Sequence, residues 1–241
     1  FCKVRSYAKI MRILGFIPAR SGSTRLKNKN LKKFLGKPLI YHTIKFVKKL
    51  KLDQVFVSTN SKRIKKIEKK FKIYNDYIRP KKLSGTNSQI IDAILDGLNW
   101  FLLNKKKKFD AVMVFQPTTP YRDLLDTKKI INLFRKKKLQ SLATVSKTSD
   151  HPQHIFKIHN TKWKFILNKK VNSLNKQDLS EDYFVENGHN YLCSVKFLKK
   201  YKKFIVKNKT FLYKQKISTL DIDYLQDFKI CEFRVKEKLF S

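Results

Sequence analysis

A turn rich in glycine, serine and basic residues follows the first apolar run of the chain. This basic turn, residues 17–31, reads Ile-Pro-Ala-Arg-Ser-Gly-Ser-Thr-Arg-Leu-Lys-Asn-Lys-Asn-Leu. The small residues around Gly22 let backbone N–H groups approach phosphate oxygens. The side chains of Arg20, Arg25 and Lys29 can neutralise a polyphosphate, each contact contributing roughly 1.5–3 kcal/mol. We therefore predict a triphosphate-binding turn, although the spacing is neither a Walker loop nor a G-x-G-x-x-G fingerprint and equally fits an ordinary strand-to-helix loop.

Two aspartates near the carboxyl end form the second group with a chemical signature. Asp221 and Asp223 flank Ile222, and in an extended segment residues two apart face the same side. Two such carboxylates can share a Mg²⁺ ion, whose octahedral shell is completed by phosphate and water oxygens. The alternative is a capping pair before a helix that starts near Tyr224. In the metal interpretation Asp227, one turn into that helix, supports the ligands without touching the ion.

Apolar periodicity predicts alternating strands and helices around these groups. Continuous apolar runs predict buried strands, and apolar residues three or four positions apart predict helices. The expected strands are residues 12–17, 55–57, 111–115, 142–145 and 191–195, and the expected helices are marked by Ile40/Ile44/Val47, Ile64/Ile67/Phe71, Ile90/Ile94/Leu98/Phe101, Ile130/Phe134 and Leu225/Phe228. This order predicts a parallel, Rossmann-like three-layer α/β/α fold. In such a sheet, loops that leave the carboxyl ends of strands bind ligands.

The alternation breaks after Asp150, where short β-like pieces and polar turns fill residues 151–186. We interpret residues 151–186 as an arm inserted in a single domain that spans residues 11–241. Residues 1–10 precede Met11 and are interpreted as a disordered upstream extension outside the fold.

The charge of the chain raises a function of a different class. The sequence has 56 Lys and Arg against 18 Asp and Glu, a formal charge of +38. Counterion release rewards clustered cations, so a basic nucleic-acid-binding protein is an alternative. We discount it because the lysines occur throughout, with only 6 Gly and 6 Pro, a bias that AT-rich coding also produces. No apolar stretch reaches the roughly 18 residues that span a bilayer. We expect neither a membrane nor a specific nucleic acid as partner.

The cysteine content bears on the compartment. Cys2, Cys193 and Cys231 are an odd number of cysteines without metal-type spacing. That pattern favours reduced thiols over a disulfide framework, and we therefore expect a cytoplasmic protein.

The basic turn also carries a family signature, the pattern I-P-A-R-x-G-S-x-x-(L/I)-x-x-K-N. Its matching positions are Arg20, Gly22, Ser23, Leu26, Lys29 and Asn30. Further matches follow in the family's order, namely Val57-Ser-Thr59, Arg79-Pro80, Phe115-Gln-Pro-Thr-Thr-Pro-Tyr-Arg122, Asn187-Gly188 with Tyr191, and Asp221-Ile-Asp223. Together these motifs resemble the acylneuraminate cytidylyltransferases, which activate sialic acid and related nonulosonic acids. The related enzymes for 3-deoxy-manno-octulosonate usually carry Q-G-D-E-P, so Gln116-Pro117 argues against that alternative.

The resemblance implies a nucleotidyltransferase of the glycosyltransferase-A-like type. In this family the arm mediates a homodimer and reaches the sugar site of the neighbouring subunit. The implied reaction is attack by the anomeric hydroxyl of an acidic nine-carbon sugar on the α-phosphorus of CTP, with Mg²⁺ as cofactor and pyrophosphate as the leaving group.

The resemblance also implies a role for each matching position. The nucleotide would contact Ala19, Arg20, Ser23, Arg25, Lys29, Asn30, Arg79 and Ser88. The sugar would contact Gln116, Thr118, Thr119, Arg122, Gln177, Asn187 and Gly188, although Asn187 and Gly188 fit a plain turn equally well. Catalysis would fall to Arg20 and Lys29, with Asp221 and Asp223 holding the metal.

Three positions depart from the family pattern. Asn60 stands where Asp is frequent, Thr86 ends a segment that replaces L-A-x-D, and Lys176 stands where Arg is common. Lysine keeps the charge but lacks the planar fork of arginine, so altered sugar specificity or reduced activity is an open alternative. The sequence does not distinguish sialic, legionaminic and pseudaminic acids as the acceptor.

Overall fold

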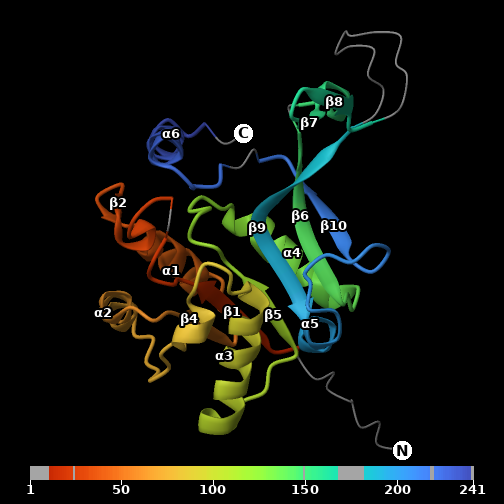
Figure 1. Cartoon of the computed structure of the whole chain (residues 1–241). Coiled ribbons are helices and arrows are strands. Elements are labelled where there is room, and N and C mark those ends of the chain that lie inside the picture. The colour runs from red at the N-terminus through yellow and green to blue at the C-terminus, as the bar shows by residue number, and fades with distance from the viewer. Residues whose placement is uncertain (1–10, 24, 149, 168–181, 218–219, 240–241) are drawn as a thin grey trace, which may run out of the picture.

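A six-stranded sheet with helices on both faces forms the centre of the molecule (Figure 1). The computed structural model describes residues 11–23, 25–148, 150–167, 182–217 and 220–239. The sheet strands are β1 (Ile13–Pro18), β4 (Gln54–Ser58), β5 (Ala111–Val114), β6 (Ser141–Lys147), β9 (Phe184–Ser194) and β10 (Phe211–Gln215). The helices are α1 (Leu39–Lys49), α2 (Lys62–Lys70), α3 (Ile90–Lys105), α4 (Leu124–Lys136), α5 (Val195–Tyr201) and α6 (Leu225–Lys236). Two small hairpins, β2 (Lys33–Phe34) with β3 (Lys37–Pro38) and β7 (Phe156–His159) with β8 (Lys162–Phe165), lie outside the sheet. Among the described helices, none has both the length and the apolar character needed to cross a bilayer.

The strand order confirms the α/β class with one exception in strand direction. The order is β10-β6-β9-β5-β1-β4, and the sheet is mainly parallel as predicted, with the exception that β9 runs antiparallel to both β5 and β6. The cause is the connection between β6 and β9. Lys147 at the end of β6 pairs with Phe184 at the start of β9, so the chain between them joins two antiparallel neighbours. Such a pair needs no crossover helix, unlike a parallel βαβ unit.

The helices divide between two apolar layers, one on each face of the sheet. The first layer joins α1, α2 and α4 to the sheet through residues such as Ile44, Ile64 and Phe134. The second layer joins α3 and α5 to the opposite face through residues such as Ile94 and Leu198. Alternate residues of β1 enter opposite layers, as expected for a strand buried on both sides. The three-layer expectation is therefore confirmed.

Helix α6 packs in a third, smaller cluster away from the sheet. It buries Phe228 and Cys231 against Leu26 of the basic turn, Phe34 of β2 and Ile222. The aromatic rings of Phe34 and Phe228 meet edge to face with centroids 5.4 Å apart. This cluster brings residues near the two ends of the chain into direct contact.

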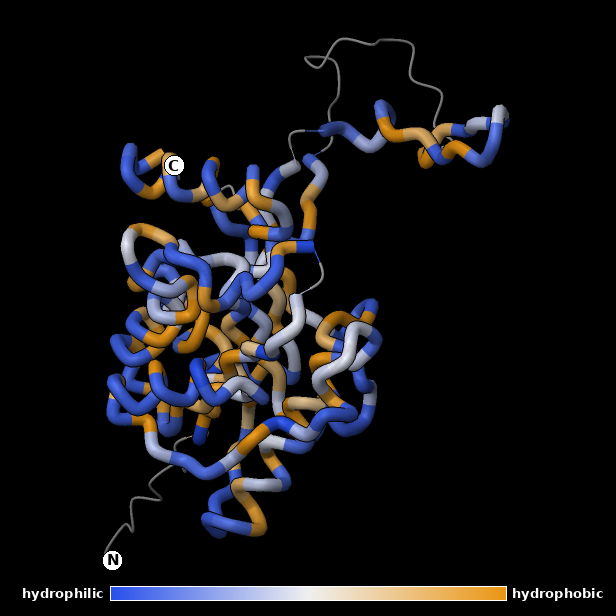
Figure 2. The backbone as a smooth tube through the Cα atoms, turned by 60° about the vertical axis from the view of Figure 1, so that its left-hand side comes forward, coloured by the Kyte–Doolittle hydropathy of each residue, from blue (hydrophilic) through white to orange (hydrophobic). Residues whose placement is uncertain are grey.

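The β7–β8 hairpin projects from the body of the molecule (Figures 1 and 2). Its residues are exposed, and Phe156, Trp163 and Phe165 contact one another with ring centroids 4.9–5.5 Å apart. These rings are 46–60% exposed. The hairpin thus presents apolar side chains to solvent within the predicted arm.

Gly97 of α3 allows the close approach between this helix and the sheet. A Cβ atom at this position would lie 2.7 Å from Cε1 of Phe56, whose ring also contacts Tyr77, Trp100 and Phe101. We expect Gly97→Ala to lower the free energy of unfolding by about 1–2 kcal/mol, because overpacking outweighs the gain in helix propensity.

Urea denaturation measures this change, and Asn99→Ala at an exposed position of the same helix is the control. The control should be neutral or slightly stabilising. A Gly97→Ala protein as stable as the parent would show that α3 does not pack as described.

Candidate active site

A cavity of about 400 Å³ opens at the carboxyl ends of β1 and β5. Four segments that are distant in sequence line it, drawn from residues 18–30, 79–90, 116–118 and 221–223. Strand β4 pairs with one side of β1, and the next strand of the sheet, β5, pairs with the other side. The order in which strands are added to the sheet therefore reverses at β1. Open α/β sheets leave a crevice for ligands at such a point. Its size is within the range of small-molecule sites.

The structure gathers most of the predicted site residues around this cavity. Those that line it are Arg20, Ser23, Arg25, Lys29, Asn30, Arg79, Ser88, Gln116, Thr118, Asp221 and Asp223. Ala19 is buried and is not among the lining residues. Thr119, Arg122, Asn187 and Gly188 are not among the lining residues, and Gln177 falls outside the described residues.

Backbone contacts to the end of β4 hold the start of the basic turn. The Ala19 N–H donates to the Ser58 carbonyl at 2.9 Å, and the Ser21 N–H donates to Oδ1 of Asn60 at 2.8 Å. A carboxylate would accept the same bond, so the departure at Asn60 preserves this anchor. Gly22 follows with a φ of 87°, a conformation that favours glycine.

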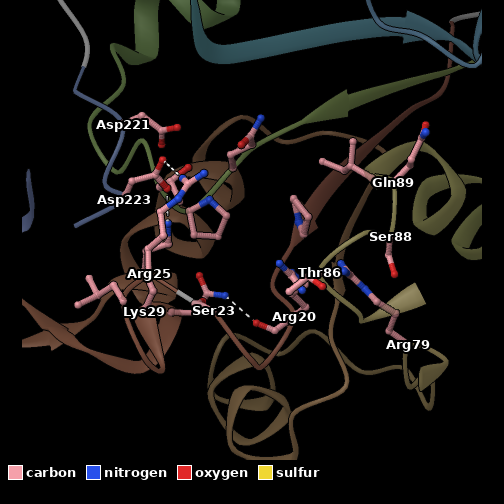
Figure 3. Close-up of a pocket in the computed structure, with 17 residues that line it drawn as sticks. Arg20, Ser23, Arg25, Lys29, Arg79, Thr86, Ser88, Gln89, Asp221 and Asp223 are labelled. Carbon is pink, nitrogen blue, oxygen red and sulfur yellow. Dashed lines mark hydrogen bonds and ion pairs between the residues drawn. The ribbon is translucent and has the colours of Figure 1, made fainter. Parts of the chain in front are cut away.

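Further side chains of the turn fix its middle. Nδ2 of Asn30 donates to the carbonyl of Arg20 at 3.1 Å, and Nη1 of Arg20 donates to the Ser84 carbonyl at 3.2 Å. Arg20 thereby joins the basic turn to the segment before α3. Figure 3 shows Arg20 and Thr86 between the acidic side of the cavity and the side that carries Arg79.

Arg79 supplies a fixed positive charge on the far side of the cavity. Its Nε donates to Oγ of Ser58 at 2.9 Å and its Nη2 donates to the Ser58 carbonyl at 2.7 Å. Burial, with a smaller contribution from the charge of Arg20, lowers the pKa of Arg79 to about 10. The guanidinium still carries its charge at neutral pH, so this side attracts anions.

The basic turn and the acidic segment, residues 221–223, meet on the opposite side (Figure 3). Nζ of Lys29 donates to the Ile222 carbonyl at 2.6 Å and lies 3.1 Å from Oδ1 of Asp223. Nη1 of Arg25 forms an ion pair with Oδ2 of the same carboxylate. The Ile222 N–H donates to the Thr118 carbonyl at 2.9 Å, which fixes the segment to the loop after β5.

Apolar packing explains why the charged side chains face one another. Leu26 and Ile222 both belong to the third cluster, and Ile222 is fully buried. Because Ile222 points inward, Asp221 and Asp223 on either side of it line the cavity. The prediction that the two carboxylates share one side is therefore confirmed, whereas metal binding stays a prediction.

Helix capping falls to a different aspartate. Oδ2 of Asp227 accepts bonds from the N–H groups of Asp223, at 2.9 Å, and Tyr224, at 2.7 Å. Asp227 thus caps α6 and also holds the backbone of Asp223. The alternative of Asp221 and Asp223 as a capping pair is wrong, since no capping bond of the described helix comes from either side chain.

Arg122 supports the loop after β5 from behind. It is 6% exposed, and its guanidinium donates to the carbonyls of His189 at 3.0 Å, Gln116 at 2.8 Å and Thr119. Burial lowers the pKa of Arg122 to about 9. The observed geometry is that of a buried brace for the loop that carries Gln116 and Thr118, and a direct contact between Arg122 and a sugar stays a prediction.

Asn187 and Gly188 belong to a bulge where β9 shifts register against β6. Asn187 accepts a bond from Oγ1 of Thr144 and donates to Oγ of Ser146 and Oε1 of Gln215. Gly188 has a φ of 67°. The bulge directs the His189 carbonyl to Arg122. Asn187 and Gly188 therefore lie inside strand β9 and do not form a separate turn, and their contact with a sugar stays a prediction.

Sequence reasoning missed two polar residues of the lining, Thr86 and Gln89. Gln89 is the N-cap residue of α3, and its side chain makes no capping bond. The sequence signal that could have identified Gln89 is its position: it is a polar residue directly before a helix that begins at the ligand-binding edge of the sheet. Lys176 lies outside the described residues.

The fold and the cavity together define an α/β protein with a ligand crevice at the carboxyl ends of its parallel strands. A solved CMP-2-keto-3-deoxy-manno-octonic acid synthetase in complex with CTP superimposes with a TM-score of 0.68 at 16% identity, covering 94% of this chain and 99% of that one. A putative glucose-1-phosphate thymidylyltransferase from Bacillus anthracis gives a TM-score of 0.63 at 15% identity, covering 93% and 96%. At these identities the similarity concerns the fold alone.

The sequence identifies the family. The family described as cytidylyltransferase matches residues 14–229, and the chain belongs to it. It is 38% identical over 113 residues to the CMP-N,N'-diacetyllegionaminic acid synthase of Legionella pneumophila, which is 46% of this chain and 48% of that protein. It is 24% identical to the N-acylneuraminate cytidylyltransferase of Escherichia coli, covering 91% of this chain and 51% of the relative. The matches thus span about half the length of these two relatives. The post-translational flagellin modification protein B of Campylobacter coli is 28% identical, with 94% and 96% covered.

The brace formed by Arg122 can be tested by Arg122→Lys. One ammonium cannot serve the three carbonyls that the guanidinium reaches, so we expect a loss of about 2–4 kcal/mol in the free energy of unfolding. Arg20→Lys is the matched control, because Arg20 donates to one carbonyl only in the described structure. Urea denaturation of both variants measures the difference, and equal stabilities would exclude the brace.

His189 makes stability depend on pH. Its ring is buried, and burial with the nearby charge of Arg122 lowers its pKa to about 3. The unfolded chain binds a proton near pH 6.5 whereas the folded chain does not, so stability is full above pH 6.5 and falls as the pH drops toward 3. Between pH 7 and pH 5 this group should cost about 2 kcal/mol.

Urea unfolding at the two pH values measures that loss in the parent protein, in His189→Gln and in His159→Gln. His159 lies on the exposed hairpin and is the matched control. The loss should shrink in His189→Gln and persist in His159→Gln. An unchanged loss in His189→Gln would contradict the assignment to His189.

Proposed function

We propose that this chain transfers CMP from CTP to the anomeric hydroxyl of an acidic nine-carbon sugar and releases pyrophosphate. The observation that carries the proposal is the meeting of the basic turn and the acidic segment in one cavity of a cytidylyltransferase-family chain. The names of the relatives add support, since they refer to legionaminic, acylneuraminic and pseudaminic acids.

The charges of the cavity suit a nucleoside triphosphate. Four basic side chains and two acidic side chains line it, leaving an excess of positive charge for an anionic ligand. Arg20, Ser23 and Lys29 all line the cavity, and we assign them to the phosphate oxygens. Asn30, Arg79 and Ser88 lie around the cavity where the nucleoside would bind. Fixed cations of this kind stabilise the charge that develops on the α-phosphate and the leaving pyrophosphate.

The acidic segment fits a magnesium ion. Asp221 and Asp223 offer hard carboxylate oxygens on the cavity side, and no group of three potential ligands from His, Cys, Asp and Glu occurs in the part of the chain that the structure describes. Two carboxylates completed by phosphate and water are the usual magnesium arrangement beside a nucleotide. A bound ion would neutralise charge on the phosphates.

The acceptor would enter from the side of Gln116 and Thr118. Its hydroxyl oxygen forms a bond to the α-phosphorus, the bond from that phosphorus to the oxygen bridging the β-phosphate breaks, and the hydroxyl proton leaves to solvent. Alignment of the two substrates is the main catalytic contribution of such a site.

We extend the proposal to a homodimer in the cytoplasm, where nucleoside triphosphates are available. The exposed aromatic side chains Phe156, Trp163 and Phe165 support this assembly, since apolar surface of this kind is commonly covered by a partner.

Product analysis tests the function directly. The purified chain is incubated with CTP, Mg²⁺ and one acceptor at a time: sialic, legionaminic, pseudaminic or 3-deoxy-manno-octulosonic acid. The masses of the products are measured by mass spectrometry. We expect a CMP adduct of a nine-carbon acid with stoichiometric pyrophosphate. Asp221→Asn should lower the rate by about 10²-fold or more, because it removes charge from the proposed metal site.

The matched control is Asp76→Asn, an exposed aspartate outside the cavity lining, which should keep the parental rate. If pyrophosphate is released with none of the nine-carbon acids tested, the proposal is contradicted. Adduct formation with the octulosonic acid alone would instead assign the chain to the related octulosonate enzymes.

A further inference from the structure

The two carboxylates of the acidic segment have different surroundings. Asp223 contacts the side chains of both Arg25 and Lys29. Asp221 lines the same cavity, and no ion pair among the described residues includes it. One proposed metal ligand is therefore open, and the other is already neutralised by cations of the chain itself.

The two cations on Asp223 also differ from each other. The Lys29 side chain is 12% exposed and has a second bond to the Ile222 carbonyl, so it is part of the fixed structure. The Arg25 side chain is 56% exposed, and apart from this ion pair it lies over the ring of Tyr224, whose centroid is 5.9 Å from the guanidinium carbon. Arg25 can leave Asp223 without breaking the link between the basic turn and the acidic segment.

We propose that Arg25 occupies Asp223 in the nucleotide-free protein and transfers to the phosphates when the nucleotide binds, which releases Asp223 to the metal. This inference rests on the proposed function. Arg25 pairs with Oδ2 of Asp223 and Lys29 with Oδ1, so a metal ion that binds this carboxylate would compete with these cations. The nucleotide removes that competition because its phosphates attract the guanidinium more strongly than a single carboxylate does.

The consequence is coupling between metal and nucleotide. A metal ion alone meets one open ligand, Asp221, and one blocked ligand, Asp223. Binding of the nucleotide unblocks the second ligand, so each should strengthen the binding of the other by the same factor. Arg25 then acts as a positioning residue that keeps the complete metal site from forming before the nucleotide is present.

Metal binding without nucleotide gives a readout that is independent of activity. The dissociation constant of Mn²⁺ alone is measured by the EPR signal of the free ion at low ionic strength, where surface charges are least screened. We expect Arg25→Ala to bind Mn²⁺ about fivefold more tightly than the parent, in keeping with the modest strength of exposed ion pairs. Arg20→Ala is the matched control, since Arg20 also lines the cavity but contacts the Ser84 carbonyl and not Asp223.

A titration with CTP in the presence of EDTA separates a failure of the proposed function from a failure of the inference about Arg25. Both Arg25→Ala and Arg20→Ala should bind CTP more weakly than the parent, because both lose a cation near the phosphates. If the parent binds neither CTP nor Mn²⁺, the proposed function fails. If the parent binds both and Arg25→Ala binds Mn²⁺ with the parental constant, only the inference about Arg25 fails.

A double-mutant cycle shows whether the effect passes through Asp223. In an Asp223→Asn background, Arg25→Ala should no longer tighten Mn²⁺ binding, because no competition is left to relieve. A persistent fivefold effect there, or an equal effect from Arg20→Ala, would overturn the proposal in favour of a general change in potential. Arg25→Gln, which removes the charge but keeps a longer polar side chain than alanine, repeats the test should Arg25→Ala fail to fold.

Discussion

The contact between Lys29 and the acidic segment is the interaction on which the rest of the site depends. A single ammonium joins a turn that follows the first strand to a segment that precedes the last helix, through the Ile222 carbonyl and the Asp223 carboxylate. Apolar packing supports this contact from behind, because Leu26 and Ile222 belong to one cluster with α6. The exclusion of water by that cluster gives the polar link its fixed geometry, since a lysine held beside buried apolar residues has few alternative positions.

The acidic segment is held from three directions, by a turn, a loop and a helix. The basic turn extends from β1 and provides Lys29. The loop after β5 provides the Thr118 carbonyl, and Arg122 braces that loop against the bulge of β9. Helix α6 provides Asp227. The antiparallel strand β9 therefore contributes to the site indirectly, by placing a carbonyl where Arg122 can use it.

The sequence predicted the parts of this arrangement that depend on local pattern. The strand-to-turn signal at Pro18 to Lys29 and the alternation of Asp221, Ile222 and Asp223 were readable because each depends on neighbouring residues. The direction of β9 could not be predicted, because a parallel and an antiparallel strand can have the same apolar pattern. Only the pairing of β9 with β6 determines its direction. Helix α5 was missed because seven residues carry too little helical periodicity. Strand β10 was missed because its Lys214 and Gln215 interrupt the apolar run that marked the other strands. The brace formed by Arg122 depends on carbonyls that the fold brings together. The sequence motif does not show whether its arginine contacts a ligand or the backbone, so this role could not be predicted.

The central claim is that the basic turn and the acidic segment hold one nucleotide and one metal between them. The most direct test is an anomalous difference map from crystals grown with CTP and Mn²⁺. The account predicts a single manganese peak at roughly 2.1 Å from a carboxylate oxygen of Asp221. The same peak should contact a phosphate of CTP, with the triphosphate lying against Arg20 and Lys29. Manganese at the acidic segment with the triphosphate elsewhere, or CTP in the cavity with manganese away from Asp221, would contradict it.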